Sequence, residues 1–241
     1  MKQEKGFVLY DGPSMLDGKP IVVIATMKTS NEKTGAMIQT WILRSDLNPI
    51  EASKSKADIS ICGNCSLRQS LGGACYVSIH QAPLAVYKSY KRGLYPDFNI
   101  DMHKDLFTKR KIRLGAYGDP ASVPYKIFDD MVKLCRGHTG YTHQYNHQNF
   151  DKRYLDICMV SADTLAIATR MHKQKARTFR VIAIDAPKPN TEEVECLSES
   201  EGLSCIECGQ CDGKRSDPSI YIRAHGSRSK RFLNNAIIAR G

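Results

Sequence analysis

The sequence predicts an α/β fold, with a TIM-like or partial (β/α) barrel as its architecture. Three observations support this prediction. The first 50 residues are rich in strand-like segments, and from Val77 onward helix-like and strand-like segments alternate. The connections between the later segments are short, which is typical of a parallel sheet. About five or six such units fit a barrel or part of one, with a doubly wound open sheet as the competing arrangement.

The chain of 241 residues is expected to form a single barrel-like domain, because this length suffices to bury one sizeable core. Residues 1–60 are predicted to be a β-rich N-terminal segment, with turn-rich stretches between the strands. Residues 187–217 are predicted to be a cysteine-rich, metal-binding insertion. The strands expected in the first segment are FVLY (7–10), IVVIATM (21–27), TWILR (40–44) and a short one within ADISICGNC (57–65).

After Val77, apolar runs bounded by turns are predicted as strands and amphipathic stretches as helices. The strands are expected in KIRLGAYG (111–118), TGYTHQY (139–145), LDICMVSA (155–162), RTFRVIAID (177–185) and IYIRAHG (220–226). The helices are expected over 78–92, 122–136 and 163–174, and in the last element, SKRFLNNAII (229–238). Parallel sheets bind their ligands at the carboxyl ends of the strands, so the residues that follow each strand are the first candidates for a site.

The composition predicts a basic, soluble protein with nucleic acid as its partner. The chain has 35 lysines and arginines against 25 acidic residues, a net charge of +10 and a pI near 9.1. Such a surface attracts phosphates over a long range. No apolar run approaches the roughly 20 residues that a membrane helix needs. The N-terminus has no secretory pattern, so a cytoplasmic protein without membrane contact is expected.

Basic residues beside the predicted strand ends are the candidate contacts to a nucleic-acid backbone. A solvated basic face without a partner is the alternative interpretation. The candidate residues are Lys33, Arg110, Lys111, Arg228, Lys230 and Arg231.

Polar residues follow several of the predicted strands. Asp119 follows one strand and Asp163 another, and for each the alternative role is that of an N-cap for the next helix. Their convergence on one edge of the sheet indicates paired carboxylates, one acting as a nucleophile and the other as a general acid or base. The residues expected to contact a substrate there are Tyr117, His143, Gln144 and Ser161.

Four of the nine cysteines form a C-terminal cluster whose spacing indicates a metal site. Two residues separate Cys205 from Cys208 and Cys208 from Cys211, so that three thiols on a tight loop can face one ion. Disulfides are uncommon in the cytosol, and clustered thiols there indicate metal binding. A tetrahedral thiolate set is typical of zinc or of an iron–sulfur cluster, and the fourth ligand is Cys196 or His225.

Cys62, Cys65 and Cys75 form a second candidate metal site. No fourth cysteine accompanies them, so the set is completed by His80, by a more distant histidine, or by an open position for a bound cofactor. Three-cysteine loops ahead of an α/β barrel also suggest an iron–sulfur enzyme of radical type. The spacing here differs from the Cys-x3-Cys-x2-Cys that is usual in that class.

Several stretches together resemble a group of small proteins common in phages and plasmids, and more remotely the tRNA-guanine transglycosylase superfamily. The phage branch of that superfamily is similar to the DNA deazapurine transglycosylases, which place 7-deazaguanine bases into DNA. The superfamily resemblance rests on the barrel-like alternation, the strand-end residues Asp119 and Asp163, and the C-terminal cysteine loop. The stretches are KTGAMIQTWILR (33–44), ICGNC (61–65), ACYV (74–77), RLGAYGDPA (113–121), TGYTHQY (139–145), MVSAD (159–163) and the Cys-x2-Cys-x2-Cys motif (205–211).

The resemblance implies base exchange on DNA, in the cytoplasm of a phage host. An aspartate attacks the anomeric carbon of a deoxyguanosine, guanine leaves, and a 7-deazaguanine base takes its place. Asp163 is the nucleophile and Asp119 the base, or the reverse, and the target base is flipped out of the duplex. The metal is then a structural zinc in the 187–217 insertion.

Two alternatives stay open beside base exchange. One is an iron–sulfur enzyme of radical type that uses Cys62, Cys65 and Cys75. The other is a non-catalytic DNA-binding protein that zinc stabilises.

Overall fold

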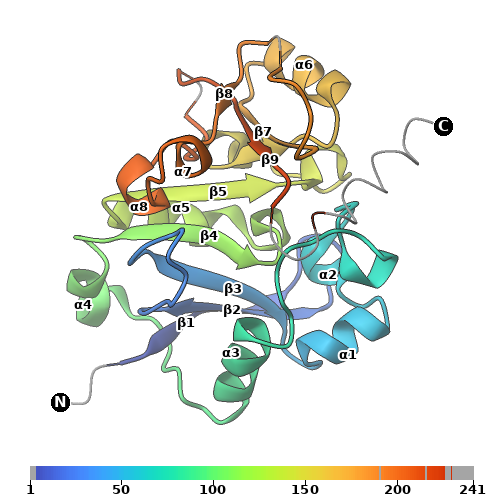
Figure 1. Ribbon diagram of the computed structural model, residues 1–241. Helices are drawn as coiled ribbons and strands as arrows, with labels where there is room; N and C mark the ends of the chain where they lie inside the picture. The colour runs from blue at the N-terminus through green and yellow to red at the C-terminus, as the bar shows by residue number, and fades with distance from the viewer. Residues whose placement is uncertain (1–3, 190, 215, 226–228, 230–241) are drawn as a thin grey trace.

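The computed structural model describes residues 4–189, 191–214, 216–225 and 229 (Figure 1). Within these residues, nine strands form one sheet in the order β1-β2-β3-β4-β5-β6-β7-β9-β8, which confirms the α/β class. β1, β2 and β3 pair antiparallel, whereas every later pair of neighbours is parallel. The strands are β1 (Gly6–Pro13), β2 (Pro20–Thr26), β3 (Ile38–Arg44), β4 (Lys111–Tyr117), β5 (Gly137–Thr142), β6 (Met159–Ser161), β7 (Thr178–Ile182), β8 (Val194–Glu195) and β9 (Ile220–Arg223).

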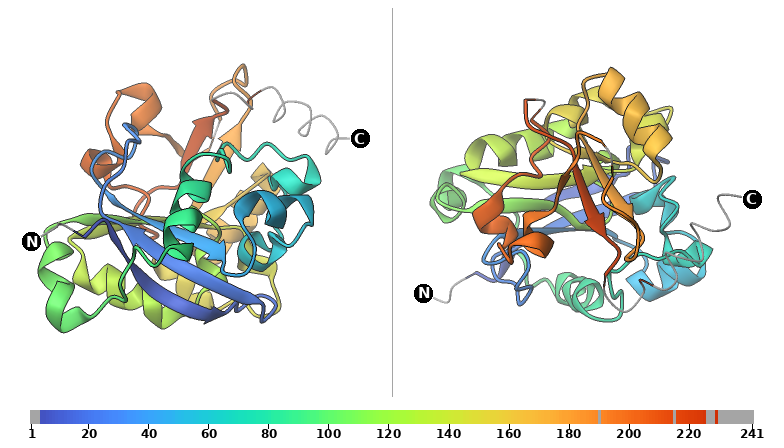
Figure 2. Two further views of the ribbon diagram at one scale, coloured as in Figure 1. Left: turned by 90° about the horizontal axis from the view of Figure 1, so that it is seen from below. Right: turned by 45° about the horizontal axis from the view of Figure 1, so that its top comes forward.

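The sheet is open in the described residues, so the α/β class is borne out but the predicted TIM-like or partial barrel is not confirmed. In the described part of the chain, β1 and β8 are its two edges. The reason is that β1 to β3 form an antiparallel meander, while the insertion 187–217 adds β8 outside β9 instead of leading the sheet back to β1. Figures 1 and 2 show the strong twist of the sheet, which turns β9 across the direction of β4 and β5.

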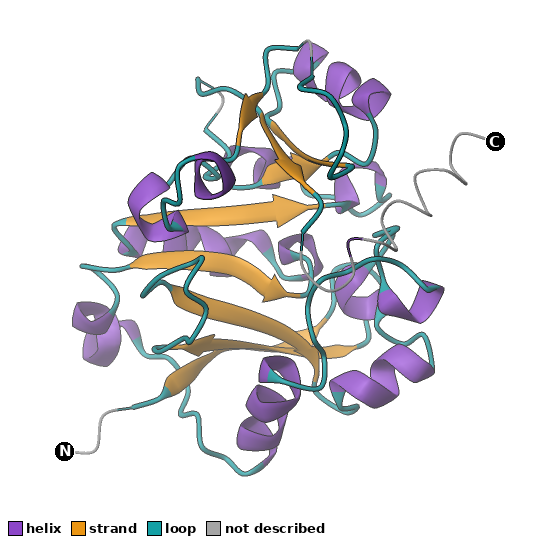
Figure 3. Ribbon diagram, in the orientation of Figure 1, coloured by secondary structure: helices purple, strands orange, loops and turns teal. Residues whose placement is uncertain are grey.

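Helices lie on both sides of the sheet (Figure 3). The helices predicted over 78–92, 122–136 and 163–174 correspond to α3, α5 and α6, and the final predicted helix, 229–238, lies outside the described residues except for Ser229. None of the described helices is long and apolar enough to cross a bilayer. The helices are α1 (Pro49–Lys54), α2 (Ile59–Cys62), α3 (Ala82–Lys91), α4 (Ile100–His103), α5 (Tyr125–Leu134), α6 (Leu165–Lys173), α7 (Leu197–Ser200) and α8 (Cys205–Cys208).

The β-rich N-terminal segment ends at Arg44 and does not extend to residue 60 as predicted. Asn48 starts α1, because its side-chain oxygen accepts hydrogen bonds from two backbone N–H groups at 2.9 and 3.0 Å. The stretch 57–65, which was expected to contain a strand, forms α2 instead. Its single turn closes where the Cys62 N–H donates to the Asp58 carbonyl at 2.9 Å.

Alternate residues of the parallel strands meet two different environments, because successive side chains of a strand point to opposite faces. On β4, Ile112 and Leu114 are fully buried in the main core, to which Phe128 of α5 also belongs. Arg113 and Gly115 point the other way and line a cavity. The same period of two brings side chains of the neighbouring parallel strands to this cavity.

His138 on β5 links the sheet to two later parts of the chain. Its Nε2 lies 3.1 Å from the Ile157 carbonyl and 2.8 Å from the Asp212 carbonyl, so this nitrogen carries a proton and donates. The ring is 9% exposed, and burial lowers the pKa of His138 although Asp212 acts in the opposite direction. The folded protein therefore favours the neutral ring.

We expect the free energy of unfolding to fall as the pH falls below about 6.5, the ordinary pKa of histidine. The unfolded chain then binds a proton that the folded chain resists, so stability is complete above that pH and declines below it. Urea titrations at several pH values should show that His138→Gln weakens this decline, whereas His80→Gln, at an exposed position, retains it. An unchanged pH profile in His138→Gln would contradict the assignment.

Candidate functional site

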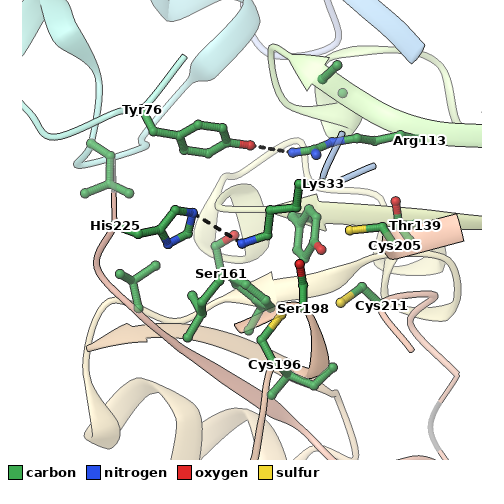
Figure 4. A pocket seen from close by; sticks show the side chains of 18 of the residues that line it. Lys33, Tyr76, Arg113, Thr139, Ser161, Cys196, Ser198, Cys205, Cys211 and His225 are labelled. Atoms are coloured by element: carbon green, nitrogen blue, oxygen red, sulfur yellow. Dashed lines mark hydrogen bonds between the residues drawn. The ribbon is translucent and has the colours of Figure 1, made fainter. Parts of the chain in front are cut away.

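A cavity of about 630 Å³ lies against one face of the parallel strands (Figure 4). Strand residues at alternating positions form much of its wall, and both cysteine groups line it. We call Cys62, Cys65 and Cys75 the first cysteine group. The second cysteine group is Cys196, Cys205, Cys208 and Cys211. The structure thus brings together two clusters that lie about 120 residues apart in the sequence.

The first cysteine group begins where α2 ends in a turn that requires glycine. Gly63 has φ +49°, and a Cβ at this position would lie 2.1 Å from Oε1 of Gln144. The turn continues with the Cys65 N–H donating to the Cys62 carbonyl at 3.1 Å. The glycine within the CGNC motif therefore lets the loop pack directly against the Gln144 amide.

Arg68 holds this loop from within. Its guanidinium donates to the Gly63 carbonyl at 2.8 Å and to the Asp58 carboxylate at 3.0 Å, and the Arg68 and Asp58 side chains are 6% and 5% exposed. The chain then returns, because the Cys75 N–H donates to the Leu67 carbonyl at 2.8 Å. Burial raises the pKa of the Cys62 thiol well above its ordinary value, and the nearby Cys75 adds to this shift.

Asp119, a predicted catalytic residue, is buried and its carboxylate accepts four hydrogen bonds. Oδ1 accepts from the Ala121 N–H at 3.0 Å and from the Thr142 hydroxyl at 2.8 Å. Oδ2 accepts from the His143 N–H at 2.7 Å and from the Gln144 amide at 3.2 Å. Burial raises the pKa of Asp119, and these hydrogen bonds oppose that shift. Asp119 also caps the turn at 120–122, so the capping alternative holds for this residue.

Gln144, predicted to contact a substrate, connects Asp119 to the first cysteine group. Its amide nitrogen donates to the Cys62 carbonyl at 2.9 Å as well as to Asp119, and its oxygen accepts from the Asn64 N–H at 3.0 Å. The side chain is fully buried and does not line the cavity. Its hydrogen bonds thus serve the loop that carries the cysteines.

Asp163 and His143 face the cavity beside the same loop. His143 Nε2 lies 3.4 Å from Asp163 Oδ1, and the Ser66 hydroxyl donates to Asp163 Oδ2 at 2.7 Å. The Asp163 side chain is 36% exposed, so it is accessible to a ligand. Burial by itself raises the pKa of Asp163, but His143 and Ser66 lower it overall. Burial lowers the pKa of His143, yet Cys65 and Asp163 raise it well above its ordinary value.

Each part of the second cysteine group is anchored to a different element. The Cys205 N–H donates to the Lys33 carbonyl at 2.7 Å, and the Cys196 N–H donates to the Tyr221 carbonyl at 2.9 Å. The Cys211 carbonyl accepts from the Gly140 N–H on β5 at 3.0 Å. The insertion 187–217 is therefore fixed to the sheet and to the hairpin before β3.

The thiols of the second cysteine group are neighbours. Burial raises the pKa of Cys211 to about 12, and Cys196, Cys205 and Cys208 add to this shift. His225, the alternative fourth ligand, lies with its Nε2 3.3 Å from Lys33 Nζ. The geometry thus favours Cys196 over His225 as the fourth member of the group.

Neither cysteine group is preformed as a coordination shell. In the residues that the structure describes, no set of three or more His, Cys, Asp or Glu side chains has the geometry of a metal-holding group. His80, an alternative ligand of the first group, is exposed and does not line the cavity. The predicted metals therefore stay predictions that rest on the chemistry of the donors.

The structure describes three of the six predicted nucleic-acid contacts, namely Lys33, Arg110 and Lys111. Arg110 donates to the Met27 and Ala36 carbonyls at 2.7 and 2.8 Å, so it holds the turn before β3. Lys33 lines the cavity, and Lys111 lies beside Gly209 in the second cysteine group's loop. The other three candidates, Arg228, Lys230 and Arg231, lie outside the described residues.

Tyr117 and Ser161 line the cavity, as expected of residues that contact a ligand. Sequence reasoning missed Arg113, which lines the cavity too. A signal was present, because a charged residue in the middle of KIRLGAY interrupts an otherwise apolar strand at an inward position. Sequence reasoning also missed Arg68, for which no such pattern exists.

We expect Gln144→Ala to lower the free energy of unfolding by about 1–3 kcal/mol, since buried partners on Asp119, Cys62 and Asn64 lose their hydrogen bonds. It should also speed the reaction of Cys62 and Cys65 with a thiol reagent. Urea titration and thiol labelling measure the two effects. Gln81→Ala, at an exposed position whose side chain makes no capping bond, is the matched control. Equal effects in the two variants would refute the role assigned to Gln144.

The chain was also compared with protein-family models, with curated proteins and with solved structures, and none of these comparisons finds a match. The resemblance to transglycosylases consequently stays a prediction. The function has to be argued from the geometry of the cavity and the chemistry of its lining residues.

Proposed function

We propose that this protein is an iron–sulfur enzyme of radical type, with the first cysteine group as the ligands of its cluster. One observation carries the proposal: the polar residues that follow β4, β5 and β6 all converge on the loop of the first cysteine group. Gln144, which Asp119 positions, donates to the Cys62 carbonyl on the buried side of the loop. His143 and Asp163 contact the loop where it faces the cavity. A binding loop supported in this way is typical of a preorganised site.

The donor set fits an iron–sulfur cluster. Cysteine thiolates are the usual ligands of such clusters, and three of them leave one of four positions open. Cys62, Cys65 and Cys75 all line the cavity, so the open position would face the space where a ligand binds. Bound there, a cluster supplies one-electron chemistry, including the generation of radicals from a bound cofactor.

The residues around the first cysteine group have distinct roles in this proposal. Arg68 and Gln144 hold the loop rigid through buried hydrogen bonds. His143 lies between Cys65 and Asp163, with its Nε2 3.4 Å from Asp163 Oδ1, and it lowers the pKa of that carboxyl against the effect of burial. Apolar side chains such as Phe179 from β7, Ile220 and Ile222 also line the cavity and would limit the access of water to reactive intermediates.

The second cysteine group supports a further metal centre at the same cavity. Four neighbouring thiols suit zinc or a second iron–sulfur cluster. Because Cys196, Cys205 and Cys211 line the cavity, this centre would form part of the ligand-binding wall, in addition to bracing the insertion 187–217.

The transglycosylase hypothesis and the DNA-binding hypothesis stay predictions. A paired-carboxylate mechanism needs two reactive carboxylates, and both oxygens of Asp119 are engaged by four donors. Asp163 is therefore the more accessible of the two predicted aspartates, and it contacts the first cysteine group through Ser66 and His143. This arrangement favours the iron–sulfur hypothesis over base exchange.

We expect the protein purified without oxygen to contain iron and acid-labile sulfide and to absorb visible light, because thiolate-bound clusters have charge-transfer bands. The triple variant Cys62→Ser, Cys65→Ser, Cys75→Ser should lose the iron assigned to that group. Cys135→Ser, at a buried cysteine of the core, is the control and should retain it. Metal analysis decides the matter: zinc alone, with no iron or sulfide after reconstitution, would sink the proposal.

Nucleoside analysis of DNA from cells that express the protein and receive a 7-deazaguanine precursor separates the two enzymatic hypotheses. We expect only ordinary nucleosides, since the proposed chemistry does not exchange bases. A modified base that persists in the triple cysteine variant and disappears in Asp163→Ala would establish base exchange instead.

A further inference from the structure

We propose that Arg113 is the anion-binding residue of the cavity and that it receives a carboxylate or phosphate group of the substrate. This inference rests on the proposed function only in assuming that the cavity is a ligand site. It adds the chemical class of the ligand, because it requires an anionic group on the substrate.

Arg113 comes from the middle of β4 and points to the cavity face of the sheet. Its neighbours Ile112 and Leu114 point to the core, so the strand's alternation fixes the direction of the side chain. Figure 4 shows the guanidinium between Tyr76, which follows Cys75 of the first cysteine group, and Cys205 of the second. The guanidinium thus lies between the two cysteine groups.

Among the described residues, no carboxylate pairs with the guanidinium of Arg113. One Nη donates to the Tyr76 hydroxyl, and the guanidinium carbon lies 6.0 Å from the centre of the Tyr141 ring. Nε is buried and has no hydrogen-bond partner. In the part of the chain that the structure describes, no carboxylate lies within ion-pair distance of this side chain.

Other basic side chains that are buried or line the cavity differ from Arg113, because they have carboxylate partners. The four described arginines that are buried each have a carboxylate partner; the pairs are Arg44–Asp46, Arg68–Asp58, Arg177–Asp212 and Arg180–Glu193. Lys33, which also lines the cavity, pairs with Glu199. A buried charge without a partner is costly, so an unpaired one in a cavity indicates that the ligand supplies the opposite charge.

The chemistry of the free edge specifies the ligand group. Guanidinium presents its donors in a planar fork that matches the two oxygens of a carboxylate or phosphate. Tyr76 engages one N–H of one Nη group, so one of the two edges of the guanidinium, Nε–Nη or Nη–Nη, retains both of its parallel donors for such a contact. Tyr76 therefore orients the fork, and the anion meets the remaining edge.

The thiolates of the second cysteine group are the competing counterion. Cys205 is near enough to influence Arg113, and a metal with four thiolates carries net negative charge. However, the hydrogen bond that Arg113 makes goes to Tyr76 on the opposite side, and its Nε has no sulfur within hydrogen-bond distance. This geometry favours an incoming anion, and the experiment below makes the thiolate alternative one of its outcomes.

Titration calorimetry with inorganic phosphate and, separately, with succinate tests the proposal on protein purified without oxygen. We expect saturable binding of at least one of these anions to the wild type, and the stronger of the two identifies the group that the ligand carries. Arg113→Gln should weaken that binding about tenfold or more, and Arg113→Lys, which keeps the charge without the planar fork, should have an intermediate effect. Arg153→Gln, at an exposed arginine paired with Asp151 outside the cavity, should leave the affinity unchanged.

Thermal unfolding and metal analysis of the same variants complete the test. If Arg113→Gln does not fold, Tyr76→Phe, which removes only the orienting hydroxyl at an exposed position, should still weaken anion binding. Equal anion affinity in Arg113→Gln and wild type, or no saturable binding to the wild type, overturns the proposal. Loss of metal from the second cysteine group with unchanged anion affinity overturns it too, because Arg113 then neutralises the thiolates.

The same measurement separates this inference from the proposed function. The triple variant Cys62→Ser, Cys65→Ser, Cys75→Ser should bind the anion with unchanged affinity, because Arg113 lies outside that group. Wild-type protein that holds no iron or sulfide after reconstitution, yet binds the anion through Arg113, would refute the iron–sulfur proposal and leave the role of Arg113 standing.

Discussion

The buried carboxylate of Asp119 is the constraint on which the rest of the site depends. It lies just after β4, and it accepts hydrogen bonds from the turn at 120–122, from the end of β5 and from Gln144. Each such bond to a charged acceptor contributes about 1.5–3 kcal/mol when its partner would otherwise be buried and unpaired. Gln144 links Asp119 to the loop of the first cysteine group, because its amide also hydrogen-bonds to the backbone of Cys62 and Asn64. Two strand ends and one loop thereby share a single anchor.

This anchor changes the interpretation of the residues that follow the strands. A carboxylate that four donors hold in place is suited to position its neighbours, whereas a nucleophile needs a free lone pair directed at the substrate. Asp163 retains such access, but it shares it with His143 and Ser66 at the loop of the first cysteine group. The acids, the imidazole and the thiols consequently belong to one site. That unity is why the iron–sulfur hypothesis accounts for more of the structure than base exchange does.

The distribution of buried charge divides the molecule into structural and functional parts. Arg68, Arg177 and Arg180 are each buried against a carboxylate, and each joins two separate stretches of the chain. Such pairs contribute little net stability beyond their cost of desolvation, but they define which segments meet. Arg113 lacks this compensation and lies in the cavity between the two cysteine groups. A ligand with an anionic group would complete the charge balance that the protein alone leaves open.

The sequence by itself determined the alternation of strands and helices after Val77, the metal-type spacing of both cysteine groups, and the strand-end position of Asp119 and Asp163. These features are local, because they depend on a period of two or 3.6 and on residue spacing along the chain. The pattern in 57–65 misled, since the alternation in ISIC is too short to distinguish a strand from a single helical turn such as α2. Only the tertiary structure decided that the sheet stays open, because β1 and β8 each pair with a single neighbouring strand in the described residues and not with each other. It also decided that Asp119 and Gln144 serve the first cysteine group and that both groups line one cavity. Those relations join residues up to about 150 positions apart, and they arise from the packing of parallel strands, which no local pattern records.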